Sequence, residues 1–391
     1  MKRVAAWQCR VATALTLCVV AGSVSAVEPY QEYRKLIESA QNLTALKDDL
    51  FGESVSLYNG KTEFAVTDVS LPGNNALPVQ MRRRFSVEMD LVGSGSFNAS
   101  LDGVGGWEVD TPYITGMFPG ASAWLNNRCS GDMVPQWPIS FRLNEVWQGN
   151  MIHVPGGGDR TMLGAWNNTP MPTDGVARKW STSHRDAIDC IPMKSGLAGE
   201  GYRVRTTSGE SYFFDTAFTR FGGTLERSGG EGDRTKIART RIYLMASRVE
   251  DRSGNWVQDE YNGNGHPTRI WSSDGREITL AYNGTLLVSV TAAGRTWNYG
   301  YGQVEGQNRL TAVTQPDGST WSYAYSSALR AWEKVNWDGN SNETCQEQPP
   351  ERDGTLVMTI KHPSGAMGEF QFSNGRQYRS GVHASECIRR I

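Results

Sequence analysis

The sequence has almost no net charge and no long apolar run. Its 39 Lys and Arg residues nearly balance 41 Asp and Glu residues, which leaves a formal charge of -2 at pH 7. A chain without a basic surplus has no electrostatic reason to bind nucleic acid or an anionic membrane. A membrane-spanning helix needs about 20 apolar residues, and no run approaches that length. We therefore expect no nucleic-acid partner and no transmembrane segment.

The common catalytic and metal-binding motifs are also absent. The chain has no Gly-x-Ser-x-Gly nucleophile turn, no Walker loop, no His-Glu-x-x-His and no Cys-x-x-Cys, which are motifs of hydrolases, nucleotide-binding proteins and zinc sites. Gly156–Gly158 with Asp159 and Gly164 matches no phosphate-binding spacing and indicates a flexible loop. We expect no catalytic residue, no cofactor and no metal, and thus a protein that is not an enzyme.

Glycine and aromatic residues are abundant instead. The 391 residues include 43 glycines, 13 tryptophans, 14 tyrosines and 12 phenylalanines. The glycine share exceeds the usual value of roughly 7%, and many glycines stand in Asn-Gly, Asp-Gly and Gly-Gly pairs, which form turns between strands. This composition predicts a mainly β fold.

The N-terminus has the layout of a secretory signal peptide. Lys2, Arg3 and Arg10 precede the apolar run Val11–Ala21, and small residues lead up to Ala26. This order of charged, apolar and small residues predicts cleavage after Ala26. We therefore expect an exported protein that is secreted, periplasmic or attached to the cell surface, with residues 1–26 removed.

Export makes disulfide bonds the expected state of the remaining cysteines. Removal of the signal peptide leaves four of the six cysteines, and four allow three connectivities. Their order along the chain favours Cys129–Cys190 and Cys345–Cys387, because each pair then falls inside one region of the sequence.

Three regions follow the signal peptide. Residues 27–52 form a helical segment, because apolar residues recur at steps of three and four between Pro29 and Gly52. Residues 53–240 show short period-two strands separated by turns, which predicts a β-rich region. Residues 241–391 contain a repeat, and residues 339–354, rich in Asn, Glu and Pro, interrupt it as an insertion.

The repeat places a turn glycine seven residues before an aromatic residue. The pairs are Gly254 and Tyr261, Gly275 and Tyr282, Gly294 and Tyr301, Gly318 and Tyr325, and Gly365 and Phe372. Trp297 and Trp321 precede their tyrosines on the same strand face. A period near twenty with one β-hairpin per unit predicts a stacked hairpin array or β-solenoid. We expect the aromatic rows, Tyr299 and Tyr323 included, to form its core; if exposed, they could instead bind sugars.

The repeat resembles the tandem YD repeats of Rhs/YD-repeat proteins. The resemblance rests on Tyr261–Ile270 and Asp274–Gly284, with Asn in place of Asp after each tyrosine. Upstream, Tyr58–Asn75, Gly106–Asp110 and Tyr202–Asp215 are similar to the N-terminal region of such proteins. Together these stretches cover roughly residues 55–390.

This resemblance implies part of a β-strand shell, which in bacterial polymorphic toxins and Tc-type complexes encloses a C-terminal effector domain. Family members are longer and end the shell at a self-cleaving core motif built on Asp-Pro. The sequence contains no Asp-Pro, so neither self-cleavage nor a toxin domain is carried over. The chain resembles the N-terminal portion of such a shell.

Several charged groups could carry other functions. Glu108 and Asp110 beside Trp107 are candidates for the paired carboxylates of a glycosidase, although a structural strand explains them better. The five histidines (His153, His184, His266, His362 and His383) are scattered, and we expect surface or turn positions for them. His184 with Asp186 and Asp189 is the nearest approach to a ligand cluster and also indicates a loop. In the strand containing Arg82–Arg84, alternate arginines must face opposite sides.

The sequence thus favours a secreted or cell-surface structural protein, a shell or scaffold segment involved in toxin delivery or competition between cells. A carbohydrate-binding wall or adhesion protein is the alternative, and a secreted glycosidase is a distant third. A surface glycan or a toxin effector is the expected partner.

Overall fold

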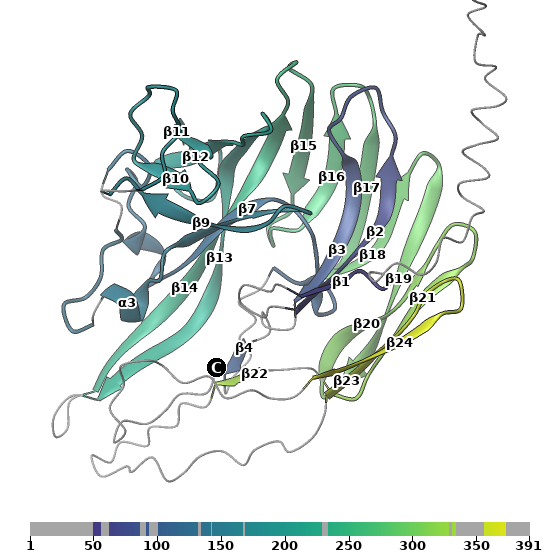
Figure 1. The fold of residues 1–391 in the computed structure, drawn as a ribbon. Coiled ribbons are helices and arrows are strands. Elements are labelled where there is room, and N and C mark those ends of the chain that lie inside the picture. Colours follow the sequence, from purple (N-terminus) through teal and green to yellow (C-terminus); the bar gives the residue numbers. More distant parts are fainter. Residues whose placement is uncertain are drawn as a thin grey trace, which may run out of the picture. The chain divides into compact units, whose positions relative to one another are not determined.

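The computed structural model describes residues 50–55, 62–86, 91–93, 101–131, 134–141, 143–166, 169–228, 234–327, 331–333 and 356–372. The signal peptide, nearly all of the predicted helical segment, the insertion and the Cys345–Cys387 pair lie outside these residues. The described chain is mainly β, as the composition predicts, and its sheets are almost entirely antiparallel (Figure 1). No helix in this part of the chain is long and apolar enough to cross a bilayer.

The N-terminal strands form a small sheet of their own. Its order is β1 (Glu53–Val55), β2 (Thr62–Leu71), β3 (Val79–Ser86), β6 (Trp107–Val109) and β5 (Gly103–Val104). Apolar residues alternate along β3, so Val79, Met81 and Phe85 point to one face and are buried there. This five-stranded sheet therefore has one face built for packing.

The repeat region forms one antiparallel ladder in sequence order. It contains β15 (Trp256–Tyr261), β16 (Pro267–Ser272), β17 (Glu277–Asn283), β18 (Leu286–Ala292), β19 (Arg295–Val304), β20 (Gln307–Thr314), β21 (Thr320–Tyr325), β23 (Leu356–Lys361) and β24 (Met367–Phe372). The turn glycines of the repeat all have φ between 72° and 92°, a left-handed conformation that favours glycine. β21 pairs directly with β23 across the interrupted segment, so the repeat register continues beyond it.

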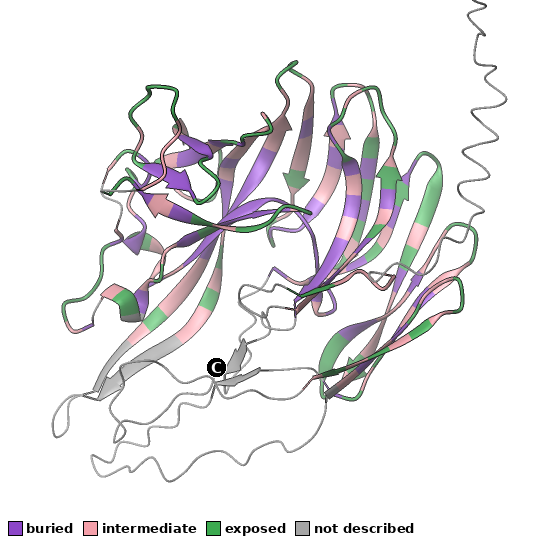
Figure 2. Cartoon of the chain, viewed as in Figure 1, coloured by how far each residue is buried: buried purple, intermediate pink, exposed green. Residues whose placement is uncertain are grey.

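The hairpins bury their aromatic rows against the five-stranded sheet. Tyr299, Trp321 and Tyr323 share one core with Phe85 and Trp107. The repeat pattern predicts that each hairpin stacks on the next. The hairpins instead hydrogen-bond edge to edge, which turns all their inner faces to the same side, and the five-stranded sheet covers that common face. Figure 2 shows the resulting alternation of buried and more exposed positions along the strands.

A second core lies where the ladder branches. The long strands β13 (Ser211–Ser228) and β14 (Arg234–Glu250) pair with each other, and β14 also pairs with β15 and β7 (Tyr113–Phe118). The branch continues through β8 (Asn150–Val154), β9 (Gly158–Gly164) and β10 (Trp180–Thr182), while β11 (Ala187–Pro192) and β12 (Glu200–Arg205) extend from β13. Residue 240, where the sequence places the boundary between the β-rich region and the repeat, lies inside β14.

The remaining described elements are short. A 3-10 turn spans Ala121–Ala123 and the helix α3 spans Leu143–Val146. The strands β4 (Leu91–Gly93) and β22 (Ala331–Glu333) form a separate parallel pair.

Candidate functional site

Three consecutive arginines on β3 hold the largest group of interacting charges described in the structure. Because successive side chains of a strand point to opposite faces, Arg83 enters the core with the repeat hairpins, while Arg82 and Arg84 face the other side. The strand pattern of the sequence predicts this alternation. We call Arg82–Arg84 the arginine strand, and its two faces form two different sites.

On the first face, Arg83 lies in an aromatic cage that joins the two sheets. Its guanidinium carbon is 4.9 Å from the Trp107 ring centroid, 5.5 Å from that of Trp321 and 5.0 Å from that of Tyr323. Its Nε is 2.8 Å from Oδ2 of Asp68, and Nη1 donates to the Tyr323 hydroxyl at 2.5 Å. Burial would lower the pKa of Arg83, but Asp68 and the surrounding hydroxyls outweigh it, so the guanidinium stays charged. A fully buried cation is thus stabilised by one carboxylate and three rings.

On the second face, Arg84 lies at the centre of an acidic cluster. Its Nε is 3.0 Å from Oε1 of Glu108, its Nη1 is 3.2 Å from Oε1 of Glu63, and its Nη2 donates to the Tyr113 hydroxyl at 2.5 Å. Burial would lower the pKa of Arg84, but the Tyr113 hydroxyl and the carboxylates outweigh it and raise that pKa. Arg84 therefore connects β2, β3, β6 and β7 through one guanidinium.

His153 extends this cluster to the β8–β9 hairpin. Its Nε2 is 2.6 Å from Oδ1 of Asp110, and its Nδ1 is 2.7 Å from Oδ1 of Asp159. Carboxylate oxygens accept hydrogen bonds, so two such contacts fit an imidazolium with both nitrogens protonated. Burial and the nearby Arg84 lower the pKa of His153, but its hydrogen bonds to the two carboxylates outweigh them and raise it.

The pKa of Asp110 moves in the opposite direction. Burial would raise it, but the hydrogen bond from His153 and the charges of His153, Arg84 and Arg82 lower it. The Nε atom of Arg82 is 3.2 Å from Oδ2 of Asp110. The carboxylate therefore stays ionised although it is buried.

Glu108 and Asp110 share one face of the chain, as expected of residues two apart. Their exposed fractions are 6% and 8%, and both face Arg84. A glycosidase needs its two carboxyl groups on either side of a sugar. Here both carboxylates instead form ion pairs inside the protein, which is a structural environment.

The histidine positions differ in part from the expected surface or turn positions. His153 and His266 are only 3% and 4% exposed. His266 Nε2 is 2.9 Å from the Leu101 carbonyl oxygen, 165 residues away in the chain, and its ring stacks on Tyr282. Asp110 is 43 residues from His153 and Leu101 is 165 residues from His266, so no local pattern indicates that these two histidines are buried. His184 is exposed, as expected.

The acids near His184 belong to separate ion pairs. Asp186 accepts from Arg160 at 2.8 Å, whereas Asp189 accepts from Arg178 at 2.8 Å and from Arg203 at 2.8 Å. They do not converge with His184 on a common point, and the segment carries no ligand cluster.

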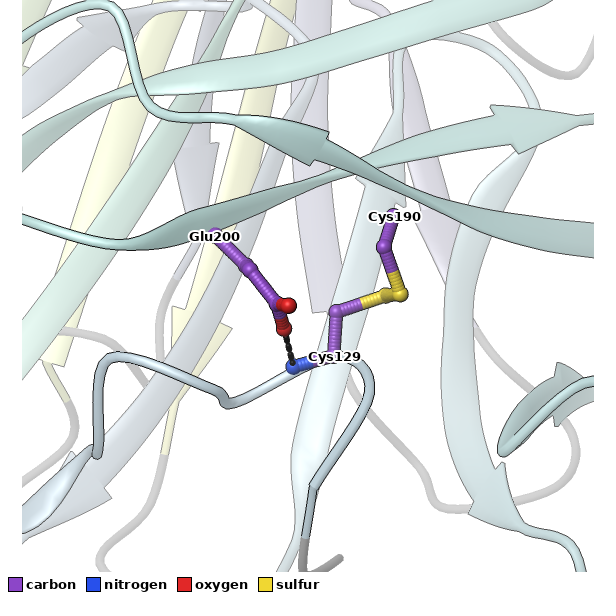
Figure 3. A group of neighbouring side chains, drawn as sticks. All are labelled: Cys129, Cys190 and Glu200. Carbon is purple, nitrogen blue, oxygen red and sulfur yellow. Dashed lines mark hydrogen bonds between the residues drawn. A yellow bond between two sulfur atoms is a disulfide. The ribbon is translucent and has the colours of Figure 1, made fainter.

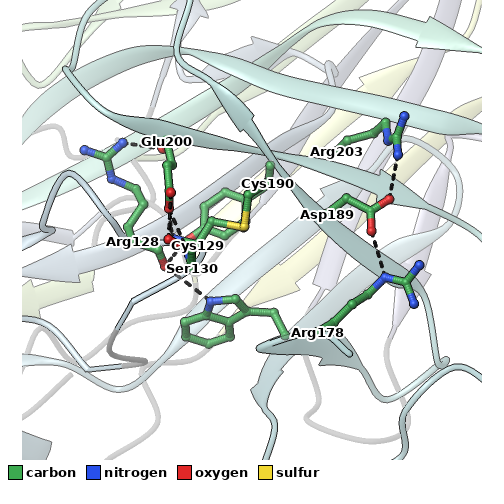
Figure 4. Close-up of a disulfide and its surroundings, with 10 residues drawn as sticks. Arg128, Cys129, Ser130, Arg178, Asp189, Cys190, Glu200 and Arg203 are labelled. Carbon is green, nitrogen blue, oxygen red and sulfur yellow. Dashed lines mark hydrogen bonds and ion pairs between the residues drawn. A yellow bond between two sulfur atoms is a disulfide. The ribbon is translucent and has the colours of Figure 1, made fainter. Parts of the chain in front are cut away.

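The predicted disulfide Cys129–Cys190 is present. It links the segment after the 3-10 turn to β11, 61 residues further on (Figure 4). Glu200 lies beside it, and its Oε2 accepts from the Cys129 backbone N–H at 3.0 Å (Figure 3). The same oxygen accepts from the Ser130 N–H at 2.8 Å. The two sulfur atoms and the Glu200 carboxylate are close enough to share a metal ion. The sulfur atoms of Cys129 and Cys190 are bonded to each other, so neither cysteine can act as a thiolate ligand.

The disulfide also borders the second core. The Arg128 carbonyl oxygen accepts from the Tyr202 hydroxyl at 2.8 Å and from the Trp180 indole N–H at 3.2 Å. Both aromatic side chains are buried. The disulfide therefore fixes a loop whose backbone carbonyl at Arg128 accepts hydrogen bonds from two side chains of the core.

In the repeat region, the half-buried Asp259 on β15 contacts the hydroxyl of Tyr261. The Tyr261 hydroxyl donates to the Ala246 carbonyl oxygen at 2.7 Å and lies 3.3 Å from Oδ2 of Asp259. The Tyr261 hydroxyl is thus the donor in both contacts, and the contact to Asp259 is the longer of the two. Burial raises the pKa of Asp259 to about 7, and the hydrogen bond from Tyr261 acts in the opposite direction and lowers it.

No family model matches the chain, and a search of curated proteins finds no significant match. The resemblance to Rhs/YD-repeat proteins thus rests on the residues quoted above and remains a hypothesis.

Proposed function

We propose that this chain is a secreted or cell-surface structural protein, a scaffold segment of a β-shell like those of Rhs/YD-repeat proteins, and not an enzyme. Its role is to build and hold a sheet of repeat hairpins. A toxin or effector domain, or a surface component of a neighbouring cell, is the partner that this role implies.

The observation that carries the proposal is the shared packing of the repeats. The hairpins form one ladder with a common inner face. That face is covered by the five-stranded sheet and tied to it by Arg83. Chemistry-bearing side chains such as Glu108 and His153 are used in internal ion pairs. This arrangement fits a structural role better than it fits the catalytic turnover of a substrate.

The carbohydrate-binding alternative would need aromatic faces other than the repeat rows. Tyr299, Trp321 and Tyr323 are buried and cannot stack on a sugar. Trp256 and Trp271 lie on the outer face of the ladder, but an arginine guanidinium lies over each ring, at 5.2 Å for Trp256 and 4.6 Å for Trp271. No geometry among the described residues favours this alternative over the scaffold.

The test combines export with a competition assay. A strain lacking the protein is complemented with wild type, Arg83→Met or Arg295→Met, and each strain is co-cultured with a susceptible competitor. Arg295 is exposed on β19 and serves as the matched arginine control. We expect the wild type and Arg295→Met, but not Arg83→Met, to restore competition, with the protein found outside the cytoplasm.

Retention of the protein in the cytoplasm would contradict the proposal, as would full competition by the strain that lacks it. A glycan array with the purified protein separates the alternative: specific binding that Trp271→Ala abolishes would favour a carbohydrate-binding role.

A further inference from the structure

The tripeptide Tyr-Asn-Gly occurs at two described turns of the repeat region. Residues 261–263 lead out of β15, and residues 282–284 lead out of β17. A third copy, residues 58–60, lies outside the described residues. An asparagine that precedes a glycine loses its side-chain amide readily, because no Cβ shields the glycine nitrogen that attacks it. The two turns therefore place the same chemistry in two different environments.

The turn after β17 leaves its asparagine free to react. Gly284 and Thr285 form a two-residue turn between the paired residues Asn283 and Leu286, and Gly284 has a φ of 63°, which glycine adopts without strain. Asn283, Gly284 and Thr285 are exposed. Neither the Asn283 carboxamide nor the Gly284 N–H has a hydrogen-bond partner among the residues that the structure describes. Nothing there holds the side chain away from the next backbone nitrogen.

The turn after β15 restrains the same side chain. Oδ1 of Asn262 accepts from the Asn264 N–H at 2.9 Å and from the His266 N–H at 3.1 Å. The Asn262 backbone is also fixed, since its N–H donates to the His266 carbonyl oxygen at 2.9 Å and its carbonyl oxygen accepts from the Gly265 N–H at 2.9 Å. The Asn262 carboxamide must therefore give up both side-chain hydrogen bonds before it can meet the nitrogen of Gly263.

We propose that Asn283 is a site of spontaneous deamidation in the folded protein, whereas the fold protects Asn262. The backbone nitrogen of Gly284 attacks Cγ of Asn283, so that an N–Cγ bond forms and the Cγ–Nδ2 bond breaks. The amide leaves as ammonia with the hydrogen of the Gly284 N–H, and a succinimide ring remains. One water molecule then opens the ring at either of its carbonyl carbons, which yields aspartate or isoaspartate. The whole step consumes one water and releases one ammonia.

The modification changes the β17–β18 hairpin in two ways. Both products carry a carboxylate where the chain has a neutral amide. Isoaspartate also routes the main chain through the former side-chain carbon, which lengthens the backbone between β17 and its turn. Because turn geometry sets the register of a hairpin, the pairing of Asn283 with Leu286 should be lost in that product. Deamidation thus weakens one hairpin of the ladder, whatever the role of the ladder.

Peptide mapping of the folded full chain by mass spectrometry tests the proposal. The protein is incubated at pH 8 and 37 °C, and the peptides that contain residues 262 and 283 are followed for the mass change from amide to acid and for the separate elution of isoaspartate. Two hydrogen bonds must break before Asn262 reacts, so we expect Asn283 to deamidate at least about tenfold faster. Equal rates, a faster Asn262, or an Asn283 that stays intact while the denatured chain reacts would each overturn the proposal.

Two controls separate the fold from the local sequence. In guanidinium chloride the two identical tripeptides should react at similar rates, and a tenfold difference that persisted there would overturn the role given to the fold. Asn283→Gln, an exposed substitution, should abolish the modification of its peptide, because glutamine would have to close a larger ring. Asn262 should react in this variant as it does in the wild type. An undiminished mass change in the Asn283→Gln peptide would overturn the assignment to Asn283.

Discussion

Replacement of Arg83 by methionine should destabilise the protein by about 3 kcal/mol. Removing one partner of a buried ion pair costs about 3–5 kcal/mol, because the remaining charge stays buried. Here that charge is Asp68, whose side chain is 2% exposed. The Tyr299 hydroxyl still donates to it at 2.9 Å, which places the expected cost at the lower end. Methionine retains the unbranched apolar stem, so loss of packing adds little.

Urea unfolding followed by circular dichroism measures this cost, and a double-mutant cycle isolates the ion pair. Asp68→Asn in the Arg83→Met background removes the unpaired charge and should recover at least about 1 kcal/mol. Arg295→Met on the exposed surface should stay within about 0.5 kcal/mol of wild type. A similarly small effect of Arg83→Met, or strict additivity in the cycle, would refute the idea that this arginine joins the two sheets.

Three further predictions concern the acid, the disulfide and the tryptophans. Asp259→Asn should stabilise the protein above pH 7 by about 4 kcal/mol at most, because the pKa of the Asp259 carboxyl group, about 7, lies well above the ordinary value of about 3.9. In urea titrations the gain in stability should vanish below pH 4, and a variant less stable than the wild type at pH 8 would contradict the raised pKa. The double variant Cys129→Ala/Cys190→Ala lacks the disulfide that joins residues 61 positions apart, and its free energy of unfolding should be lower than that of the wild type by about 4 kcal/mol, by loop entropy. Equal urea midpoints for the oxidised wild type and this variant would contradict the prediction. Trp166→Phe should remove more acrylamide-quenchable fluorescence than Trp321→Phe, because these side chains are 64% and 6% exposed; the reverse order would show that the repeat rows are not buried.

Local patterns in the sequence predicted the features that depend on neighbouring residues. Alternation along β3 predicted that Arg83 and Arg84 face opposite sides, and the fixed spacing from Gly275 to Tyr282 predicted a hairpin with a glycine turn. The order of the cysteines predicted the Cys129–Cys190 bond. Each of these inferences used a periodicity or an order that the chain carries within a short stretch or within one region.

The features that were missed depend on residues far apart in the chain. Arg83 contacts Tyr323, 240 residues away, and His153 contacts Asp110, 43 residues away. No period links such residues, so the cage and the acidic cluster emerge only when the five-stranded sheet lies on the repeats. The same reason explains why hairpins expected to stack on one another share an inner face covered by another sheet.

If the five-stranded sheet and the repeat hairpins share one core joined by Arg83, the two sheets should open together. Native-state hydrogen exchange at increasing urea measures the opening free energy of amides in β2 and β3 and of amides in β21. We expect the slowest amides of these strands to converge on one opening reaction, because Arg83 and the shared core join the two sheets. Repeat amides that stay protected under conditions where β2 and β3 exchange freely would contradict it.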